Sequence, residues 1–175
     1  MVDRLKDKTA LITGASRGIG YAIAAAYAAE GARLALNARE PRRLDAAAQT
    51  LATTYGVDVD VHACDVSERA AVDAMIAAFE RTSPLDIVVN NAGIHKSAAF
   101  LDYTPEDFRK ILDVNIYSVF HVTQAALPHL IARGTGRVIN IASSAGKWGS
   151  RNQSAYKASK HAVVGLTRCL ALEMA

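Results

Sequence analysis

The sequence predicts an α/β domain with a doubly wound parallel sheet, and three observations indicate it. Short runs rich in β-branched residues alternate with alanine-rich segments of helical periodicity along the 175 residues. The β runs are continuously apolar, which is typical of strands covered by helices on both faces. Residues suited to turns and helix caps separate the segments. Because such crossovers are right-handed, the ligand site is expected beyond the carboxyl ends of the strands.

The expected strands occupy residues 9–13, 33–37, 57–62, 87–90 and 137–141. The expected helices occupy residues 18–30, 41–55, 67–80, 104–132 and 153–174. Thr104 is the expected N-cap of the fourth helix, with Pro105 at its first position, and Ser67 is the expected N-cap of the third. Three glycines lie where helices should end: Gly31, Gly56 and Gly134.

Length and composition favour one domain, residues 1–175, with enough apolar content for a core. The net charge of +3 is small and the basic residues are scattered, so no nucleic-acid partner is expected. No apolar run is long enough for a membrane span or a signal peptide, which favours a cytoplasmic protein. Cys64 and Cys169 lack neighbouring ligands at metal spacing; both are expected to be buried, and no metal site is expected.

A glycine-rich turn, Thr13-Gly14-Ala15-Ser16-Arg17-Gly18-Ile19-Gly20, joins the first strand to the first helix. Gly14 permits a tight turn, Gly18 lets backbone amides approach a pyrophosphate, and Gly20 lets the helix pack closely. An anion would then lie at the helix N-terminus. The alternative is that the glycines only form a βα turn.

Tyr156 and Lys160 lie four residues apart, on one face of the last expected helix. The pKa of a free phenol is about 10, and an ammonium one turn away favours the ionised form. A second positive charge, such as an oxidised nicotinamide, and exclusion of water would be needed to make the phenol effective near neutrality. Taken alone, the pair is weak evidence, because such spacing occurs by chance in many helices.

Five motifs follow one another along the chain: residues 13–20, Asp65-Val66, Asn90-Asn91-Ala92-Gly93, Asn115, and Ser143 with Tyr156-x-x-x-Lys160. With these motifs the whole chain resembles the short-chain dehydrogenase/reductase family, including its NADP-dependent 3-oxoacyl reductases. The resemblance implies a Rossmann-like fold. It also implies an enzyme that transfers a hydride between NADP(H) and a carbonyl or secondary alcohol.

The resemblance also implies the catalytic roles. Tyr156 would protonate the carbonyl oxygen, Ser143 would donate a hydrogen bond to it, and Ser144 remains a competitor for that role. Lys160 would lower the pKa of the tyrosine and bind the nicotinamide ribose. Asn115 would support a water that relays protons; because asparagine has indifferent helix propensity, a backbone irregularity is expected there. The alternative for Asn115 is a polar residue on a partly exposed face.

The residues expected to bind the cofactor come from the glycine-rich turn, the strand ends and the last helix: Gly14, Ser16, Arg17, Gly18, Ile19, Gly20, Arg39, Asp65, Val66, Asn91, Ala92, Gly93, Tyr156 and Lys160. By the resemblance, Asp65 should hydrogen-bond the adenine. Asn90, Ala92 and Gly93 should line the adenosine side of the site.

The end of the second strand carries no carboxylate to select NAD. Arg39 offers a guanidinium suited to a phosphate instead, and Arg17 could add a second cation. Glu40 weakens this local positive field, and Arg39 could be an ordinary solvated charge. The charge pattern therefore favours NADP(H) over NAD(H).

The expected substrate residues are His95, Trp148 and Gln153, in loops near the reactive centre. Ile94, Ala145 and Lys147 are further candidates in the same loops. Trp148 could instead contact another subunit, and Lys147 could be a solvated charge. Small carbonyl compounds, 3-oxoacyl thioesters, cyclic ketones and sugars all remain possible substrates.

Family members continue beyond Ala175 with two further strands and a substrate lid, so the sequence is expected to be part of a longer protein. The apolar faces of 104–132 and 153–174 suit subunit contacts, which predicts a homodimer or homotetramer. The alternative function is a catalytically incompetent nucleotide-binding fragment or interaction module; an epimerase is a minor enzymatic alternative. The complete set of catalytic residues favours the oxidoreductase.

Overall fold

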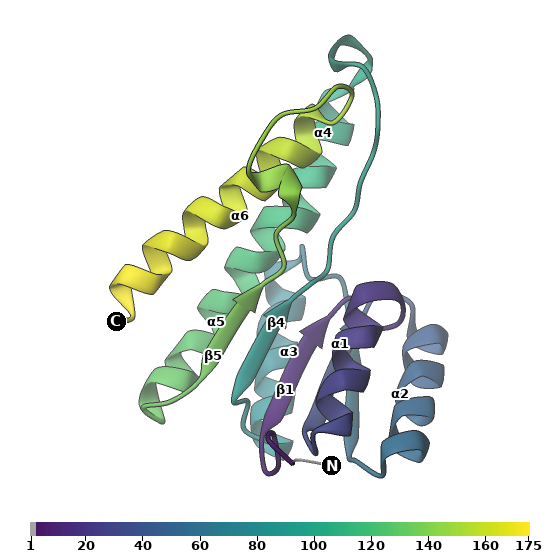
Figure 1. Ribbon diagram of the computed structural model, residues 1–175, viewed down its shortest axis with the longest axis vertical. Coiled ribbons are helices and arrows are strands. Elements are labelled where there is room, and N and C mark those ends of the chain that lie inside the picture. The colour runs from purple at the N-terminus through teal and green to yellow at the C-terminus, as the bar shows by residue number, and fades with distance from the viewer. Residues whose placement is uncertain (1–2) are drawn as a thin grey trace.

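A computed structural model describes residues 3–175 and contains a five-stranded parallel sheet of order β3-β2-β1-β4-β5 (Figure 1). The strands are β1 (Thr9–Thr13), β2 (Arg33–Ala38), β3 (Val59–Ala63), β4 (Ile87–Asn90) and β5 (Arg137–Asn140). From β1 the chain winds outward through β2 and β3, then returns to β4 on the other side of β1. This order confirms the doubly wound sheet and puts its switch point between β1 and β4.

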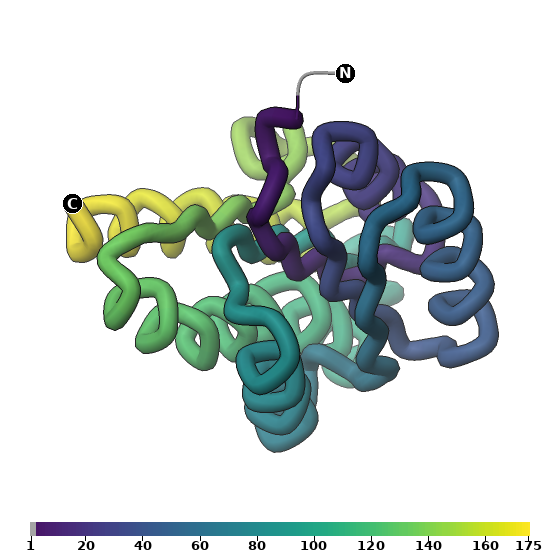
Figure 2. Tube along the Cα trace, turned by 90° about the horizontal axis from the view of Figure 1, so that it is seen from below, coloured from purple at the N-terminus to yellow at the C-terminus, as the bar shows by residue number. Residues whose placement is uncertain are grey.

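The helices are α1 (Gly18–Ala29), α2 (Pro41–Tyr55), α3 (Arg69–Thr82), α4 (Pro105–Leu112), α5 (Ser118–Ala132) and α6 (Ser154–Glu173). A π-helical turn, Asp113–Tyr117, joins α4 to α5, and 3-10 turns occupy Phe100–Asp102 and Ser144–Gly146. Figure 2 shows α1 and α3 on opposite sides of the sheet. The two faces of the sheet are therefore both covered, as the continuous apolar strands predict.

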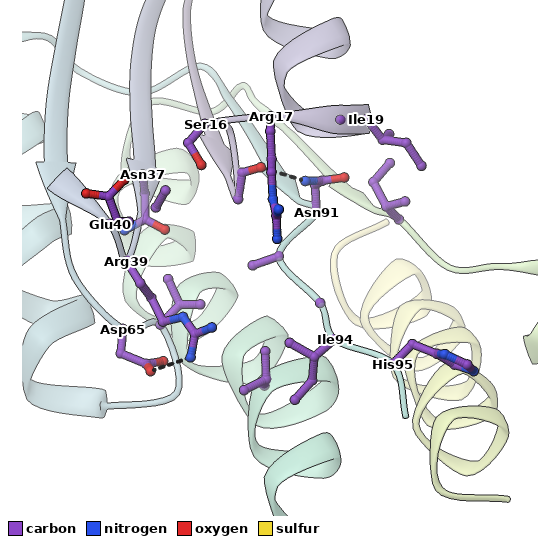
Figure 3. A pocket seen from close by; sticks show the side chains of 18 of the residues that line it. Ser16, Arg17, Ile19, Asn37, Arg39, Glu40, Asp65, Asn91, Ile94 and His95 are labelled. Carbon is purple, nitrogen blue, oxygen red and sulfur yellow. Dashed lines mark hydrogen bonds and ion pairs between the residues drawn. The ribbon is translucent and has the colours of Figure 1, made fainter. Parts of the chain in front are cut away.

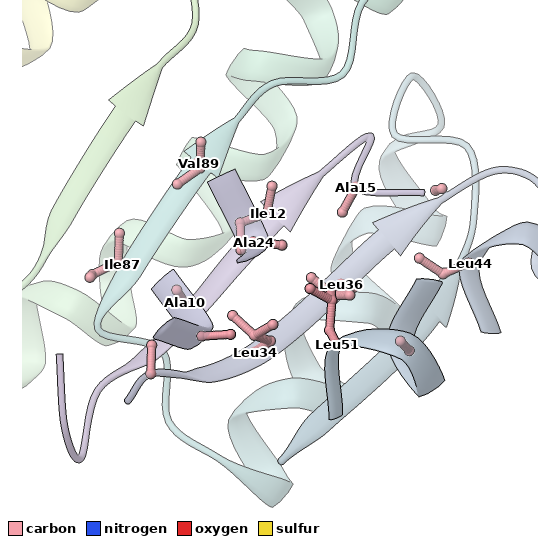
Figure 4. Close-up of a cluster of buried hydrophobic side chains, with 14 residues drawn as sticks. Ala10, Ile12, Ala15, Ala24, Leu34, Leu36, Leu44, Leu51, Ile87 and Val89 are labelled. Atoms are coloured by element: carbon pink, nitrogen blue, oxygen red, sulfur yellow. The ribbon is translucent and has the colours of Figure 1, made fainter. Parts of the chain in front are cut away.

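Successive side chains of the central strands point to opposite faces of the sheet, and each face has its own hydrophobic core. Ile12 of β1 and Leu36 of β2 pack with α1 and α2 in the cluster of Figure 4, whereas Leu11 packs with α3 and α5 on the other face. The central strands β1 and β4 are fully buried. The expectation of complete burial is wrong for β3 and β5, because each lies at an edge and has one neighbouring strand.

Several expected element ends are confirmed. β1, β4 and α2 have the expected bounds. The Thr104 hydroxyl accepts the Asp107 backbone N–H at 3.1 Å, so Thr104 caps α4, with Pro105 at its first position. The three glycines predicted to end helices all adopt positive φ: Gly31, Gly56 and Gly134.

Three local expectations are wrong. Ser67 does not cap α3, which begins at Arg69; its hydroxyl donates to Asp65 Oδ1 at 2.7 Å instead. The segment 104–132 is not one helix, because the π-helical turn divides it. Cys169 is exposed on α6, while Cys64 is partly buried. None of the helices among residues 3–175 combines the length and apolarity needed to cross a bilayer.

Replacing Gly165 by Ala is expected to raise the free energy of unfolding by about 0.5–1 kcal/mol, because alanine favours a helix interior over glycine. A Cβ at this position in α6 would meet no atom within 4 Å. Urea denaturation would measure the change. Gly56 provides the control: its surroundings are equally open, but its φ of +68° makes Gly56→Ala destabilising. A G165A variant no more stable than the natural protein would contradict the prediction.

Candidate active site

A cavity of about 620 Å³ opens at the carboxyl ends of the central strands, where the strand order reverses (Figure 3). Thirteen of the fourteen predicted cofactor residues line it: Gly14, Ser16, Arg17, Gly18, Ile19, Arg39, Asp65, Val66, Asn91, Ala92, Gly93, Tyr156 and Lys160. The cavity therefore joins the glycine-rich turn to the Tyr156–Lys160 pair. Among residues 3–175, no cluster of three potential metal ligands occurs.

Gly20 is the exception, because it is packed behind the cavity wall. A Cβ on Gly20 would lie 2.4 Å from the Gly14 carbonyl oxygen and 2.5 Å from Asn91 Nδ2. Gly14 and Gly18 adopt φ of +65° and +60°, values that glycine tolerates best. The first turn of α1 contains no acidic side chain. The side chain of Arg17, the N-cap residue, makes no hydrogen bond to the backbone N–H groups of that turn. This end of α1 therefore suits an anion.

Asn91 ties the glycine-rich turn to the end of β4. Its Nδ2 donates to the carbonyl oxygens of Thr13, at 2.9 Å, and Gly14, at 3.3 Å. The Thr13 hydroxyl accepts the backbone N–H groups of Asn91 and Ala92, both at 3.0 Å. These contacts hold two walls of the cavity together.

The expectation that Asn90 lines the adenosine side is wrong for its side chain. Asn90 is buried, and its Nδ2 donates to Thr123 Oγ1 at 2.9 Å and to Asn140 Oδ1 at 2.8 Å. The side chain faces α5 and β5 because successive residues of a strand point to opposite faces. Asn90 thus supports the sheet beneath the cavity.

Three guanidinium groups line the cavity: Arg17, Arg39 and Arg43. Arg39 Nη1 lies 3.6 Å from Asp65 Oδ2 (Figure 3). The Glu40 carboxylate accepts the backbone N–H groups of Arg42 and Arg43, so it caps α2 and lies 3.6 Å from Arg43 Nε. Arg43 is not among the cofactor residues predicted from the sequence. Its position in the first turn of α2, directly after β2, could have indicated that it lies at the carboxyl end of the sheet.

The environment of Asp65 keeps its carboxylate ionised. Partial burial by itself raises the pKa of Asp65, but hydrogen bonds from the Ser67 hydroxyl and N–H, together with the Arg39 charge, lower it overall. The carboxylate is thus available as an acceptor at the cavity wall. Cys64, beside it, also lines the cavity, and burial raises the pKa of its thiol.

Tyr156 and Lys160 project from α6 into the cavity. Lys160 Nζ lies 6.0 Å from the centroid of the Tyr156 ring and donates to the Ile141 carbonyl oxygen at 2.8 Å. Only 5% of Lys160 is exposed, and this burial lowers its pKa. A cation is therefore held beside the phenol in a partly dehydrated site.

Asn115 lies in the π-helical turn, which confirms the expected backbone irregularity. Its side chain is fully buried, so the alternative of a partly exposed polar residue is wrong. Oδ1 accepts the Ile94 N–H at 2.8 Å, and Nδ2 donates to the Ile94 carbonyl at 2.9 Å. A Cβ on Gly93 would lie 3.3 Å from Asn115 Oδ1 and 3.8 Å from Lys160 Nζ. Gly93 therefore sits between these two polar groups.

Ser143 caps the 3-10 turn that follows β5, just outside the lining of the cavity. Its Oγ accepts the Ala145 N–H at 3.1 Å, which fixes the side chain and leaves the hydroxyl hydrogen to donate elsewhere. Ala142, its neighbour, lines the cavity. Ser144 is exposed.

The candidate substrate residues divide into two groups. His95 and Ile94 line the cavity, and the His95 ring meets the Tyr156 ring edge to face, with centroids 4.9 Å apart and an interplanar angle of 87°. Trp148 is 61% exposed, and Gln153 Oε1 accepts a hydrogen bond from Ser150; neither lines the cavity. Only His95 of the three predicted substrate residues is therefore beside the tyrosine.

The family model for short chain dehydrogenases matches residues 8–175. D-beta-hydroxybutyrate dehydrogenase of Cupriavidus necator is 42% identical over 173 residues, which cover 98% of this chain and 66% of that protein. The chain thus spans slightly less than two thirds of the length of this curated relative.

Two solved structures are similar throughout the chain. NAD+-bound xylitol dehydrogenase has a TM-score of 0.95 and 34% identity, covering 98% of this chain and 66% of that one. A gluconate 5-dehydrogenase from Burkholderia cenocepacia J2315, in complex with NADP and tartrate, has a TM-score of 0.93 and 38% identity, covering 98% and 68%. Sheet order, cavity and family match agree, and the chain belongs to the short-chain dehydrogenase family.

Proposed function

We propose that this protein is an oxidoreductase that transfers a hydride between NADP(H) and a carbonyl or secondary alcohol, with Tyr156 as general acid and base. One observation carries the proposal: Tyr156 and Lys160 line the same cavity as the glycine-rich turn and the three arginines. Family membership supports hydride transfer. The choice of NADP and the catalytic assignments rest on the geometry of this cavity.

The residues present fit a dinucleotide. Gly14 and Gly18 would let the backbone approach the pyrophosphate at the N-terminus of α1, and Asp65 would accept a hydrogen bond from the adenine. Lys160 would bind the nicotinamide ribose. When bound, the nucleotide supplies or accepts the hydride.

The side chains of this chain would handle the proton. In reduction, the Tyr156 hydroxyl would protonate the carbonyl oxygen, while the Ser143 hydroxyl donates a hydrogen bond to it. The Lys160 ammonium would stabilise the phenolate left behind, with Asn115 supporting the path by which the proton is replaced. Alcohol oxidation would follow the same steps in reverse.

We propose a small hydroxy acid, a polyol or the corresponding ketone as substrate. His95, beside Tyr156, can donate or accept a hydrogen bond, which suits a substrate with a second polar group near its reacting carbon. Three of the similar proteins are named for hydroxybutyrate, xylitol and gluconate, which share this chemistry.

The test is NADPH oxidation by the protein as its gene encodes it, with the intact mass determined first. The substrate panel would contain keto acids, ketoses, 3-oxoacyl thioesters and cyclic ketones. Turnover with keto acids or ketoses would support the proposal. Nucleotide binding without turnover of any of them would indicate a binding module instead.

We expect tighter binding of NADPH than of NADH, because the 2′-phosphate would meet positive charge from Arg39, Arg17 and Arg43. Replacing Arg39 by Ala should weaken NADPH binding by about tenfold, because one charge-assisted contact to the 2′-phosphate would be lost. NADH binding should change by less than about twofold, because NADH has no 2′-phosphate. Titration calorimetry with both nucleotides would measure this. Arg42→Ala, outside the cavity lining, is the matched control. A tenfold preference for NADH would contradict the expectation.

We also propose a homodimer or homotetramer formed through the α4–α5 and α6 faces. Tyr117, at the end of the π-helical turn, is 53% exposed, and Phe120, at the start of α5, is 40% exposed. Leu172, near the end of α6, is 82% exposed. Burying such side chains in a subunit contact would remove apolar surface from water. Light scattering that finds only monomer at micromolar concentration would count against this proposal.

A further inference from the structure

We infer that Ser159 is a positioning residue of the active site: it anchors Asn115, and through it the loop at Ile94, to the turn of α6 that bears Tyr156 and Lys160. The structural part of this inference concerns contacts within the chain. Its catalytic consequence rests on the proposed function.

Ser159 uses its hydroxyl both as donor and as acceptor. Its Oγ donates to the Tyr156 carbonyl oxygen at 2.7 Å and accepts from Asn115 Nδ2 at 3.1 Å. The residue has no exposed surface, so water cannot replace either bond without a rearrangement. The hydroxyl therefore links the π-helical turn to the helical turn between Tyr156 and Lys160.

Asn115 carries this link onward to the loop after β4. One N–H of its amide is used by Ser159, the other by the Ile94 carbonyl, and its oxygen accepts the Ile94 N–H. Loss of the Ser159 hydroxyl would leave an amide hydrogen unpaired in a fully buried position. The amide could regain a partner only by turning, which would disturb its two bonds to Ile94.

The anchored loop forms part of the cavity wall. Ile94 lines the cavity, and the following residue, His95, places its ring against Tyr156. The loop after β4, the π-helical turn and α6 thus meet at a single buried hydroxyl. A shift of this loop would change the surroundings of Tyr156 without removing any group that touches a substrate.

The simpler alternative is that Ser159 only satisfies the backbone of its own helix, and Thr167 provides a matched comparison. Thr167, also in α6, donates to the Val163 carbonyl at 2.7 Å and accepts from Asn140 Nδ2 at 2.9 Å. Its hydroxyl makes the same pair of bonds, but Thr167 and Asn140 do not line the active-site cavity. Replacing either hydroxyl removes one donated and one accepted hydrogen bond, at a fully buried position for Ser159 and at a partly buried one for Thr167.

The first experiment compares amide hydrogen exchange at Ile94 in the natural protein, Ser159→Ala and Thr167→Val, all without nucleotide. Exchange at Ile94 should be about tenfold faster in S159A, because one buried hydrogen bond that holds this loop is lost. It should be unchanged in T167V. Equal exchange at Ile94 in all three proteins would overturn the inference, as would equal acceleration in both variants. Should S159A fail to fold, S159C replaces it, because a thiol fills the position but bonds weakly.

The second experiment separates positioning from stability in the active enzyme. S159A should lower kcat by about tenfold with the KM for NADPH changed by less than about twofold, while T167V should retain both values. Faster exchange at Ile94 with an unchanged kcat would overturn the positioning role. If the natural protein reduced no substrate, the proposed function would fail, and the exchange experiment would still decide whether Ser159 anchors the loop.

Discussion

Replacing Tyr156 by Phe is expected to lower kcat for carbonyl reduction by about a thousandfold, within the range that general acid–base catalysis contributes. The change removes only the phenolic oxygen. Among residues 3–175, no hydrogen bond to that oxygen is present, and the ring's contact with His95 would remain. The fold and the affinity for NADPH should therefore be retained while the proposed proton donor is lost.

Initial rates and NADPH titrations would test this expectation side by side. Tyr103→Phe is the matched control, because Tyr103 does not line the cavity. Its hydroxyl donates a hydrogen bond of 2.5 Å to the Lys96 carbonyl oxygen. Y103F should keep full turnover. A Y156F variant with more than a tenth of the natural kcat would show that another group delivers the proton.

Replacing Gly20 by Ala is expected to lower the free energy of unfolding by about 2–3 kcal/mol, at the upper end of overpacking costs. The added Cβ would lie 2.4 Å from the Gly14 carbonyl oxygen, a backbone atom that cannot move aside as a side chain can. Either α1 or the Gly14 turn must shift. Because both belong to the proposed pyrophosphate site, NADPH affinity should fall by at least about tenfold as well.

Gly18 supplies the comparison for this second prediction. A Cβ on Gly18 would meet no atom within 4 Å, so Gly18→Ala adds only the strain of a residue at φ +60°, about 1 kcal/mol. Urea denaturation of both variants and calorimetric titration with NADPH would measure the effects. If G20A proved as stable as G18A, the close approach of α1 to the Gly14 turn would not be required.

Much of the fold could be predicted because its determinants are local. The glycine-rich turn after β1 and the Thr104 cap with Pro105 each act over a few residues, and both lie where the sequence indicates. The irregular turn at Asn115 was also predictable, from the poor helix propensity of asparagine together with the family resemblance. Ser67 shows the limit of such reasoning, because a neighbouring carboxylate competed for its hydroxyl.

The order of elements, the parallel sheet and the cavity-lining motifs could be predicted from the amino-acid sequence, since periodicity and turn chemistry act along the chain. Which polar side chains meet depends on the packed tertiary structure. Asn115 joins Ile94, 21 residues away, and Ser159, 44 residues away. Asn90 turns toward Asn140, 50 residues away. Contacts at such separations depend on how helices pack on the sheet, which no local pattern of residues specifies.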